Sequence, residues 1–221
     1  MTEKIHTFLL EPEAVKQVQL YGISYPEHGI AKNANEAVVV ADKIGYPVVM
    51  KIVSSDVPHK SDVGGVIVGL DSAKAVREGY ETIVVSVKKA LPDIFIKDVL
   101  ICCQAKPGVE VIVGATKDQV FGMTLMFGLG GIFTEVLKDV AFRSIPIEAI
   151  DAEEMIQEIK GYPIFKGTRG QTPCGLSKLR ELLMSVSRLI AERPDIIELD
   201  LNPVRVYPDG VQALDVRIIC Q

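Results

Sequence analysis

The 221-residue sequence predicts an α+β (α/β) fold made of two lobes. In the first half, strand-like apolar runs alternate with segments whose apolar residues recur at helical spacing, the pattern of a mixed lobe. The turn-forming residues Lys106-Pro107-Gly108 then interrupt the chain. We therefore expect a single domain with one lobe at about residues 11–105 and a second at about residues 106–221.

The elements of the first lobe are predicted from their start and stop signals. Asn33 followed by Glu36 has the spacing of a capping box, Gly45 ends that helix, and Asp71 is the expected cap of the third helix. The predicted helices are 13–21, 33–44 and 71–90. The predicted strands are 29–32, 47–53, 66–70 and 99–104.

The second lobe begins with strands in quick succession and ends in a hairpin. Asp151 and Glu154 repeat the capping-box spacing and are expected to open a helix that Gly161 closes. Apolar residues recur along one face of a helix over 177–192, whereas residues 162–175 are expected to form an exposed loop. The predicted strands are 109–115, 120–127, 139–146, 196–206 and 211–219.

Composition excludes several classes of function. No apolar stretch approaches the roughly 20 residues of a membrane helix, and the first residues lack the features of a signal peptide, so we expect a cytoplasmic protein. A net charge of −5 without a basic run argues against nucleic acid as a partner. The four cysteines form no metal or redox motif, and we expect them to be small buried side chains.

The stretch 48–66 predicts a phosphate site. Lys51 lies within an apolar strand, and a short polar loop with His59 leads to Gly64 and Gly65 before the next strand. Lysine supplies a point charge for phosphate oxygens, and glycines let backbone N–H groups approach an anion closely. An ordinary hairpin, with a lysine that extends to solvent and a solvated histidine, is the alternative.

The terminal hairpin predicts a cluster of oxygen ligands. Strict alternation places Glu198, Asp200 and Asn202 on one face of a strand. A turn centred on residues 208–209 would pair Asn202 with Asp215 on the returning strand, unless a bulge shifts the register. Such oxygens suit Mg²⁺. A solvated face of a half-exposed sheet is the alternative.

Four blocks of sequence carry a family resemblance. They are Tyr-Pro-Val-Val-Met-Lys (46–51), His-Lys-Ser-Asp-Val-Gly-Gly-Val (59–66), Gly-Leu-Gly-Gly-Ile-Phe-Thr-Glu-Val-Leu-Lys-Asp-Val-Ala-Phe-Arg (128–143) and Glu-Leu-Asp-Leu-Asn-Pro (198–203). Together they resemble the ATP-grasp β subunit of ADP-forming acyl-CoA synthetases, in particular archaeal acetate–CoA ligase (ADP-forming), a relative of succinyl-CoA synthetase.

This resemblance implies an ATP-grasp fold whose two lobes bind nucleotide between them. It implies the reaction acetyl-CoA + ADP + phosphate ⇌ acetate + ATP + CoA, with ATP or ADP as substrate and Mg²⁺ as cofactor. In this family a CoA-binding α subunit makes the acyl phosphate, and a phosphohistidine carries the phosphoryl group to ADP on the β subunit. An α₂β₂ assembly is the implied partner arrangement.

The same resemblance assigns roles to individual residues. Lys51 would hold nucleotide phosphates, His59 would be the β-side phosphohistidine, and Asp200 would be its orienting carboxylate. Asn202 and Asp215 would bind Mg²⁺. These roles agree with the residue-based interpretation, since histidine is the nitrogen nucleophile that is neutral near pH 7 without strong pKa tuning.

The remaining implied roles concern the nucleotide. Gln104 would lie at the hinge that meets adenine, and Glu110 would face the ribose, although taken alone Glu110 is better interpreted as a surface-facing strand residue. The glycines implied to line the phosphoryl path are Gly64, Gly65, Gly128, Gly130 and Gly131.

Two other functions compete with this hypothesis. One is a regulatory ATP-grasp module that binds nucleotide without phosphoryl transfer, such as the regions fused to protein acetyltransferases. The other is a stand-alone carboxylate–amine ligase, which passes an acyl phosphate directly to an amine and needs no nucleophilic histidine. The presence of His59 favours the acyl-CoA synthetase subunit. The acyl substrate and the choice between ATP and GTP stay open.

Overall fold

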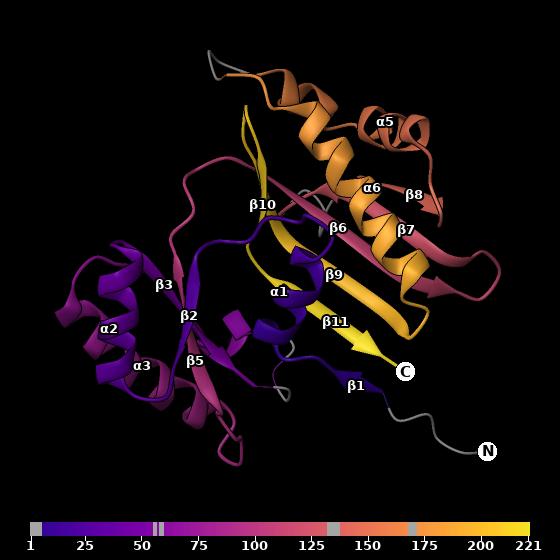
Figure 1. Cartoon of the computed structure of the whole chain (residues 1–221). Coiled ribbons are helices and arrows are strands. Elements are labelled where there is room, and N and C mark those ends of the chain that lie inside the picture. Colours follow the sequence, from indigo (N-terminus) through magenta and orange to yellow (C-terminus); the bar gives the residue numbers. More distant parts are fainter. Residues whose placement is uncertain (1–5, 55–56, 58–59, 132–137, 168–171) are drawn as a thin grey trace, which may run out of the picture. The chain divides into compact units, whose positions relative to one another are not determined.

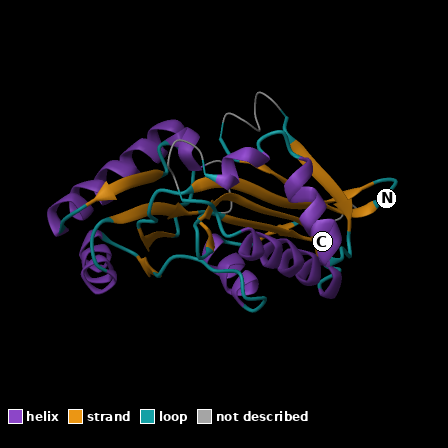
Figure 2. Ribbon diagram, turned by 90° about the horizontal axis from the view of Figure 1, so that it is seen from above, coloured by secondary structure: helices purple, strands orange, loops and turns teal. Residues whose placement is uncertain are grey.

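The computed structural model describes residues 6–54, 57, 60–131, 138–167 and 172–221. Its contacts divide the chain into two compact units, Pro26–Lys106 and Met1–Tyr25 with Pro107–Gln221 (Figure 1). Each unit combines helices with an antiparallel sheet, and Figure 2 distinguishes the two kinds of element by colour. The predicted mixture of helices and strands is confirmed.

Unit Pro26–Lys106 contains a four-stranded antiparallel sheet covered by two helices. The strand order is β2 (His28–Ala31), β5 (Asp98–Cys103), β3 (Val48–Val53) and β4 (Val66–Leu70). The helices are α2 (Ala34–Ile44), α3 (Ala73–Ala90) and the short 3₁₀ helix η1 (Lys60–Val63). Side chains from α2, α3 and one face of the sheet, including Met50 and Ile52, form one apolar core.

The caps of these helices decide where each one begins. The Asn33 side chain accepts a hydrogen bond from the Glu36 N–H at 3.0 Å, as the sequence predicted for α2. Ser72, and not Asp71, caps α3 by accepting from the Ala75 N–H. Both residues are good caps, so the one-residue difference is set by the end of β4, which local sequence does not specify.

The other unit is built on a larger, seven-stranded antiparallel sheet. The strand order is β1 (Thr7–Phe8), β11 (Val216–Cys220), β9 (Ile196–Val206), β6 (Val109–Asp118), β7 (Gly122–Leu129) and β8 (Val140–Ser144), with β10 (Val211–Ala213) also paired to β9. Its helical elements are α1 (Glu11–Gln19), α5 (Ala149–Glu158), η2 (Tyr162–Lys166) and α6 (Leu176–Glu192). Helices α5 and α6 lie side by side (Figure 1).

Residues 11–25 belong to this larger unit, although the sequence placed them in a lobe of residues 11–105. The Arg193 guanidinium, just after α6, donates to the Gln17 side chain on α1 at 2.6 Å, and the Arg188 guanidinium lies over the Tyr21 ring. Strand β1 also pairs with β11. These long-range contacts have no local signature, so periodicity did not reveal them.

Two further boundaries differ from the sequence prediction. Helix α5 begins at Ala149 because the Asp151 carboxylate accepts from the Glu148 N–H at 2.7 Å, so Asp151 lies in the first turn and does not start the helix. The C-terminal strand is interrupted between β10 and β11. In addition, the expected loop 162–175 contains η2.

None of the helices in the described part of the chain is long and apolar enough to cross a membrane.

Replacing Arg193 with alanine is expected to loosen α1. The change removes a charged hydrogen bond to Gln17 and a two-point ion pair with Asp195, so the free energy of unfolding should fall by about 1–2 kcal/mol. Urea unfolding and amide exchange within α1 measure the effect. The control is Arg180→Ala on α6, whose ion pair with Glu153 is 4.0 Å long and exposed. Equal loss in both variants would contradict this role.

Candidate functional site

Lys51 is a buried lysine in a central strand. It lies on β3 between β4 and β5, and its side chain is only 7% exposed. Met50 and Ile52 point into the core beneath α2 and α3, so the alternation of the strand directs Lys51 to the opposite face of the sheet. A buried ammonium is costly unless it is paired.

Gly64 and Gly65 close the loop that leads from η1 to β4. The Gly65 N–H donates to the Lys60 carbonyl at 2.7 Å, and a Cβ at Gly65 would lie 2.8 Å from that same oxygen. Gly64 has φ +69°, a conformation that favours glycine. Both glycines are therefore required by the loop itself. His59, directly before Lys60, lies outside the described residues.

Gln104 follows β5 and contacts a β-bulge in its own unit. Strand β4 carries the bulge at Val68–Gly69, where Gly69 has φ +75° and the pairing with β3 shifts. The Gly69 N–H points at Gln104 and donates to its Oε1 at 2.7 Å. The side-chain oxygen thus satisfies a backbone group that the bulge leaves unpaired, and the Nε2 amino group is directed elsewhere. Sequence reasoning missed this contact.

Glu110 is ion-paired across the larger sheet. It lies directly opposite Arg205 in the pairing of β6 with β9, and the Arg205 guanidinium is 2.6 Å from its carboxylate. The pair is partly exposed, with side chains 24% accessible for Arg205 and 38% for Glu110. The sequence prediction for Glu110 did not include this arginine. Any ligand of Glu110 would therefore meet a carboxylate with an oriented cationic partner.

The glycine-rich segment 128–131, called the glycine loop below, begins within the sheet. Strand β7 extends to Leu129, two residues beyond the predicted end, so Gly128 and Leu129 are paired strand residues and only Gly130 and Gly131 follow the strand. The segment passes close to other backbone. A Cβ at Gly128 would lie 2.8 Å from the Asp139 carbonyl, and one at Gly130 would lie 2.9 Å from the Glu110 Cβ. The Gly130 N–H donates to the Glu110 carbonyl at 2.8 Å, and Gly131 has φ +65°. The loop is thereby fixed beside Glu110.

Strand β9 shows the predicted alternation. Leu199 and Leu201 are buried, Asn202 is exposed, and Glu198 and Asp200 are half-buried. The polar side chains therefore share one face, as the period of two requires.

The register of this hairpin follows the predicted turn on both sides of its interruption. Ala213 pairs with Val204 and Val216 pairs with Leu201, as a turn centred on residues 208–209 requires. Asn202 and Asp215 fall in the interval between these pairs, where the Leu214 N–H donates to the Pro203 carbonyl. The predicted alignment is thus supported by the flanking pairs, although the ladder does not include Asn202 and Asp215 themselves.

Arg217 adds a cation to the carboxylate face of β9. It lies opposite Asp200 in the pairing of β11 with β9, its Nη2 is 3.4 Å from the Glu198 carboxylate, and its guanidinium stacks over Phe8. Sequence reasoning missed it because the carboxylate pattern on β9 says nothing of the strand beside it.

Two predicted ligands of this hairpin carry oxygens that suit a hard cation. Asn202 and Asp215 offer amide and carboxylate oxygens, which Mg²⁺ accepts together with water and phosphate. Across the described residues, no three His, Cys, Asp or Glu side chains gather as a metal site. The described protein ligands would therefore be few, which is the usual arrangement when a nucleotide completes the coordination.

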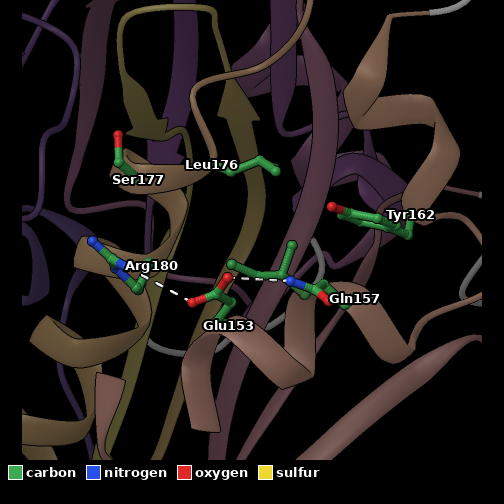
Figure 3. A pocket seen from close by; sticks show the side chains of 7 residues that line it. Glu153, Gln157, Tyr162, Leu176, Ser177 and Arg180 are labelled. Carbon is green, nitrogen blue, oxygen red and sulfur yellow. Dashed lines mark hydrogen bonds and ion pairs between the residues drawn. The ribbon is translucent and has the colours of Figure 1, made fainter. Parts of the chain in front are cut away.

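A separate pocket lies between α5, η2 and the start of α6 (Figure 3). Its volume is about 180 Å³. Among its lining residues, the Arg180 guanidinium lies 4.0 Å from the Glu153 carboxylate, and the Gln157 amide donates a hydrogen bond to the same carboxylate. The pocket contains none of the residues that the sequence predicted for the site.

Comparison with known proteins identifies the family. A family model described as an ATP-grasp domain matches residues 1–220. The chain belongs to the ATP-grasp family. The predicted family is confirmed.

Similar proteins identify the family within the ATP-grasp proteins to which the chain belongs. It is 47% identical over 211 residues to the β subunit of acetate–CoA ligase [ADP-forming] I from Pyrococcus furiosus, covering 96% of this chain and 91% of that one. A 42% identical relative, acetate–CoA ligase [ADP-forming] I of Archaeoglobus fulgidus, is longer: the match covers 94% of this chain and 30% of that protein. The chain is therefore a member of the acetate–CoA ligase (ADP-forming) family within the ATP-grasp proteins.

A solved structure supports the same family membership. The acetyl-coenzyme A synthetase 1 of Candidatus Korarchaeum cryptofilum, in complex with coenzyme A and Ca-AMPCP, matches with a TM-score of 0.95 and 45% identity over 97% of this chain and 93% of that chain. The same synthetase has been solved with a phosphorylated phosphohistidine segment and with Mg-AMPPCP. The ATP-grasp fold is confirmed, whereas the roles of individual residues stay predictions.

Replacing Gln104 tests whether its side-chain oxygen stabilises the bulge at Gly69. Gln104→Ala removes the acceptor of the Gly69 N–H and should lower the free energy of unfolding by about 1 kcal/mol. Gln104→Glu keeps an acceptor oxygen and should preserve stability, but it removes the amide donor. Urea unfolding of both variants provides the measurement. Equal destabilisation by glutamate and alanine would show that the acceptor oxygen of residue 104 does not account for the loss of stability.

Proposed function

We propose that this chain is the nucleotide-binding β subunit of an ADP-forming acetyl-CoA synthetase. The reaction is acetyl-CoA + ADP + phosphate ⇌ acetate + ATP + CoA. The observation that carries the proposal is the 47% identity to such a β subunit over 96% of the chain. The TM-score of 0.95 to a synthetase solved with a nucleotide analogue supports it.

The chemical step proposed for this chain is phosphoryl transfer through His59. An imidazole nitrogen attacks the phosphorus of acetyl phosphate, the bond from phosphorus to the acetate oxygen breaks, and acetate leaves. A β-phosphate oxygen of ADP then attacks the phosphorus, the P–N bond breaks, and ATP and free imidazole result. Histidine suits this task because its nitrogen is a neutral nucleophile near pH 7. Asp200 is proposed to orient the ring, as a carboxylate does when it accepts from the second nitrogen.

The remaining residues are proposed to bind and position the nucleotide. Lys51 neutralises phosphate charge, which the burial of its ammonium strengthens. Gln104 donates to the base through Nε2, and Glu110, held by Arg205, accepts from the ribose hydroxyls. The glycine loop and the pair Gly64–Gly65 are proposed to line the path of the transferred phosphoryl group, where the lack of side chains leaves room for it. The N–H groups of Gly65 and Gly130 are already bound to carbonyls within the protein.

Asn202 and Asp215 are proposed to hold Mg²⁺ with the nucleotide phosphates. When bound, the ion would offset the phosphate charge that the attacking nucleophile must approach. The support from this chain is the oxygen chemistry of both side chains and the register that brings their strands together.

A CoA-binding partner subunit is proposed to make the acyl phosphate. Relatives of nearly the same length are named as β subunits, and in longer relatives the matched region is 30% of the protein. An α₂β₂ arrangement of the two subunits is proposed from the family resemblance. The active enzyme is expected to require both subunits.

The phosphohistidine is testable with the purified chain. Incubation with Mg²⁺ and γ-labelled ATP should give an acid-labile, base-stable label that disappears in His59→Ala and persists in the control His6→Ala. Each labelled sample is measured before and after acid treatment. Bound nucleotide without label, even after the partner subunit is added, would favour a regulatory nucleotide-binding module.

The proposed metal ligands are testable through the Mg²⁺ dependence of the same reaction. Asp215→Asn should raise the Mg²⁺ concentration for half-maximal labelling roughly tenfold or more, because a charged ligand is lost. Asp209→Asn is the matched control, since Asp209 lies in the exposed turn of the same hairpin. If both variants keep the wild-type Mg²⁺ dependence, Asp215 is not a ligand.

A further inference from the structure

Asp139 is a buried carboxylate with two backbone partners. Its side chain lies just before β8 and is 9% exposed. One oxygen accepts from the Lys160 N–H at 2.7 Å, and the other accepts from the Gly161 N–H at 2.7 Å. Both N–H groups lie just beyond the end of α5. Asp139 therefore joins the start of β8 to the turn that follows α5.

The same residue contacts the glycine loop through its backbone. Gly128 pairs with Val140 in the sheet, and the space where a Gly128 Cβ would stand is filled by the Asp139 carbonyl and the Val140 side chain. On the far side, a Cβ at Gly161 would overlap with the Leu129 side chain. Leu129 and Gly128 are thus held between β8 and the turn at Gly161, and the Asp139 carboxylate links these two supports.

Burying an ionised carboxylate at this position between β8 and the turn after α5 has a cost in free energy. Burial disfavours a carboxylate unless its oxygens are hydrogen-bonded, and the carbonyl end of a helix carries partial negative charge. Two short charge-assisted bonds offset that cost and fix the direction of both oxygens. An amide would supply only one acceptor oxygen and would turn its NH₂ group toward the second N–H.

We propose that Asp139 is a positioning residue for the nucleotide: by tying β8 to the turn after α5, it fixes the backbone of the glycine loop in the geometry that receives the nucleotide phosphates. The inference rests on the proposed function, because that function gives the glycine loop its ligand. Asp139 itself touches neither substrate nor the transferred phosphoryl group in this role. Its effect is on nucleotide binding, carried by Gly128 and Leu129.

The test uses the enzyme assembled with its CoA-binding partner. Asp139→Asn removes one of the two acceptors and Asp139→Ala removes both. The KM for ADP should rise in that order, by roughly tenfold for alanine, which corresponds to about 1.4 kcal/mol of lost binding free energy. The turnover number at saturating ADP should fall by a smaller factor than the KM rises, because bound nucleotide holds the loop in place. If the alanine variant does not fold, the asparagine variant alone decides the outcome.

The matched control is Arg143→Gln. Arg143 also joins β8 to α5, through ion pairs of 2.7 Å to Glu158 and 3.4 Å to Glu154, and in the sheet it pairs with Leu125 rather than with the glycine loop. A general loosening of α5 would raise the KM for ADP in both variants. The proposal requires a rise with Asp139→Asn and an unchanged KM with Arg143→Gln.

Amide exchange gives a second measurement that needs no activity. In Asp139→Asn the peptides that contain residues 122–131 and 158–162 should both exchange faster than in the wild type. Faster exchange at 158–162 alone, or a wild-type KM for ADP, would overturn the proposal. If the wild-type enzyme forms no ATP from acetyl-CoA, ADP and phosphate, the proposed function fails, and the exchange of 122–131 still shows whether Asp139 holds the loop.

Discussion

The pairing of strand β9 on both of its edges is the constraint on which the candidate site depends. The strand pairs with β6 along one edge and with β10 and β11 along the other. That register sets Glu110 opposite Arg205, sets Asp200 opposite Arg217, and aligns the segments that carry Asn202 and Asp215. A slip of one residue would reverse which side chains face the core. The buried leucines of β9 therefore stabilise the positions of its polar residues as well as the sheet.

Local sequence patterns predicted the individual strands, helices and turns, but not the contacts between distant elements. The alternation along β9 and the turn at 208–209 predicted the face and the register of the hairpin, because both depend only on neighbouring residues. The arginine partners did not follow from that pattern, since Arg205 meets Glu110 through a pairing of strands 95 positions apart. The grouping of α1 with the larger unit depends on Arg193 and was missed for the same reason. Motif resemblance, rather than periodicity, supplied the family.

The glycines of the candidate site each have a steric reason to be glycine. Gly65 faces the Lys60 carbonyl, Gly128 faces the Asp139 carbonyl, and Gly130 faces Glu110. These close approaches would favour glycine with or without a bound phosphate. The glycine pattern therefore identifies tightly packed loops, and it is the lysine, the histidine and the carboxylates that indicate what such loops could bind. A tightly packed loop can still bind an anion, because close packing fixes the backbone that the anion would contact.

The bond between Gln104 and Gly69 has a consequence for the choice of purine. With Oε1 held by the Gly69 N–H, Gln104 would present its Nε2 donor to a base in its proposed role. Adenine and guanine both offer ring or carbonyl acceptors to such a donor, so this side chain by itself cannot distinguish them. Discrimination between ATP and GTP would then come from another group, one that accepts from the adenine amino group or clashes with the guanine amino group. In the proposed role of Gln104, the choice between ATP and GTP would therefore depend on groups other than its side-chain amide.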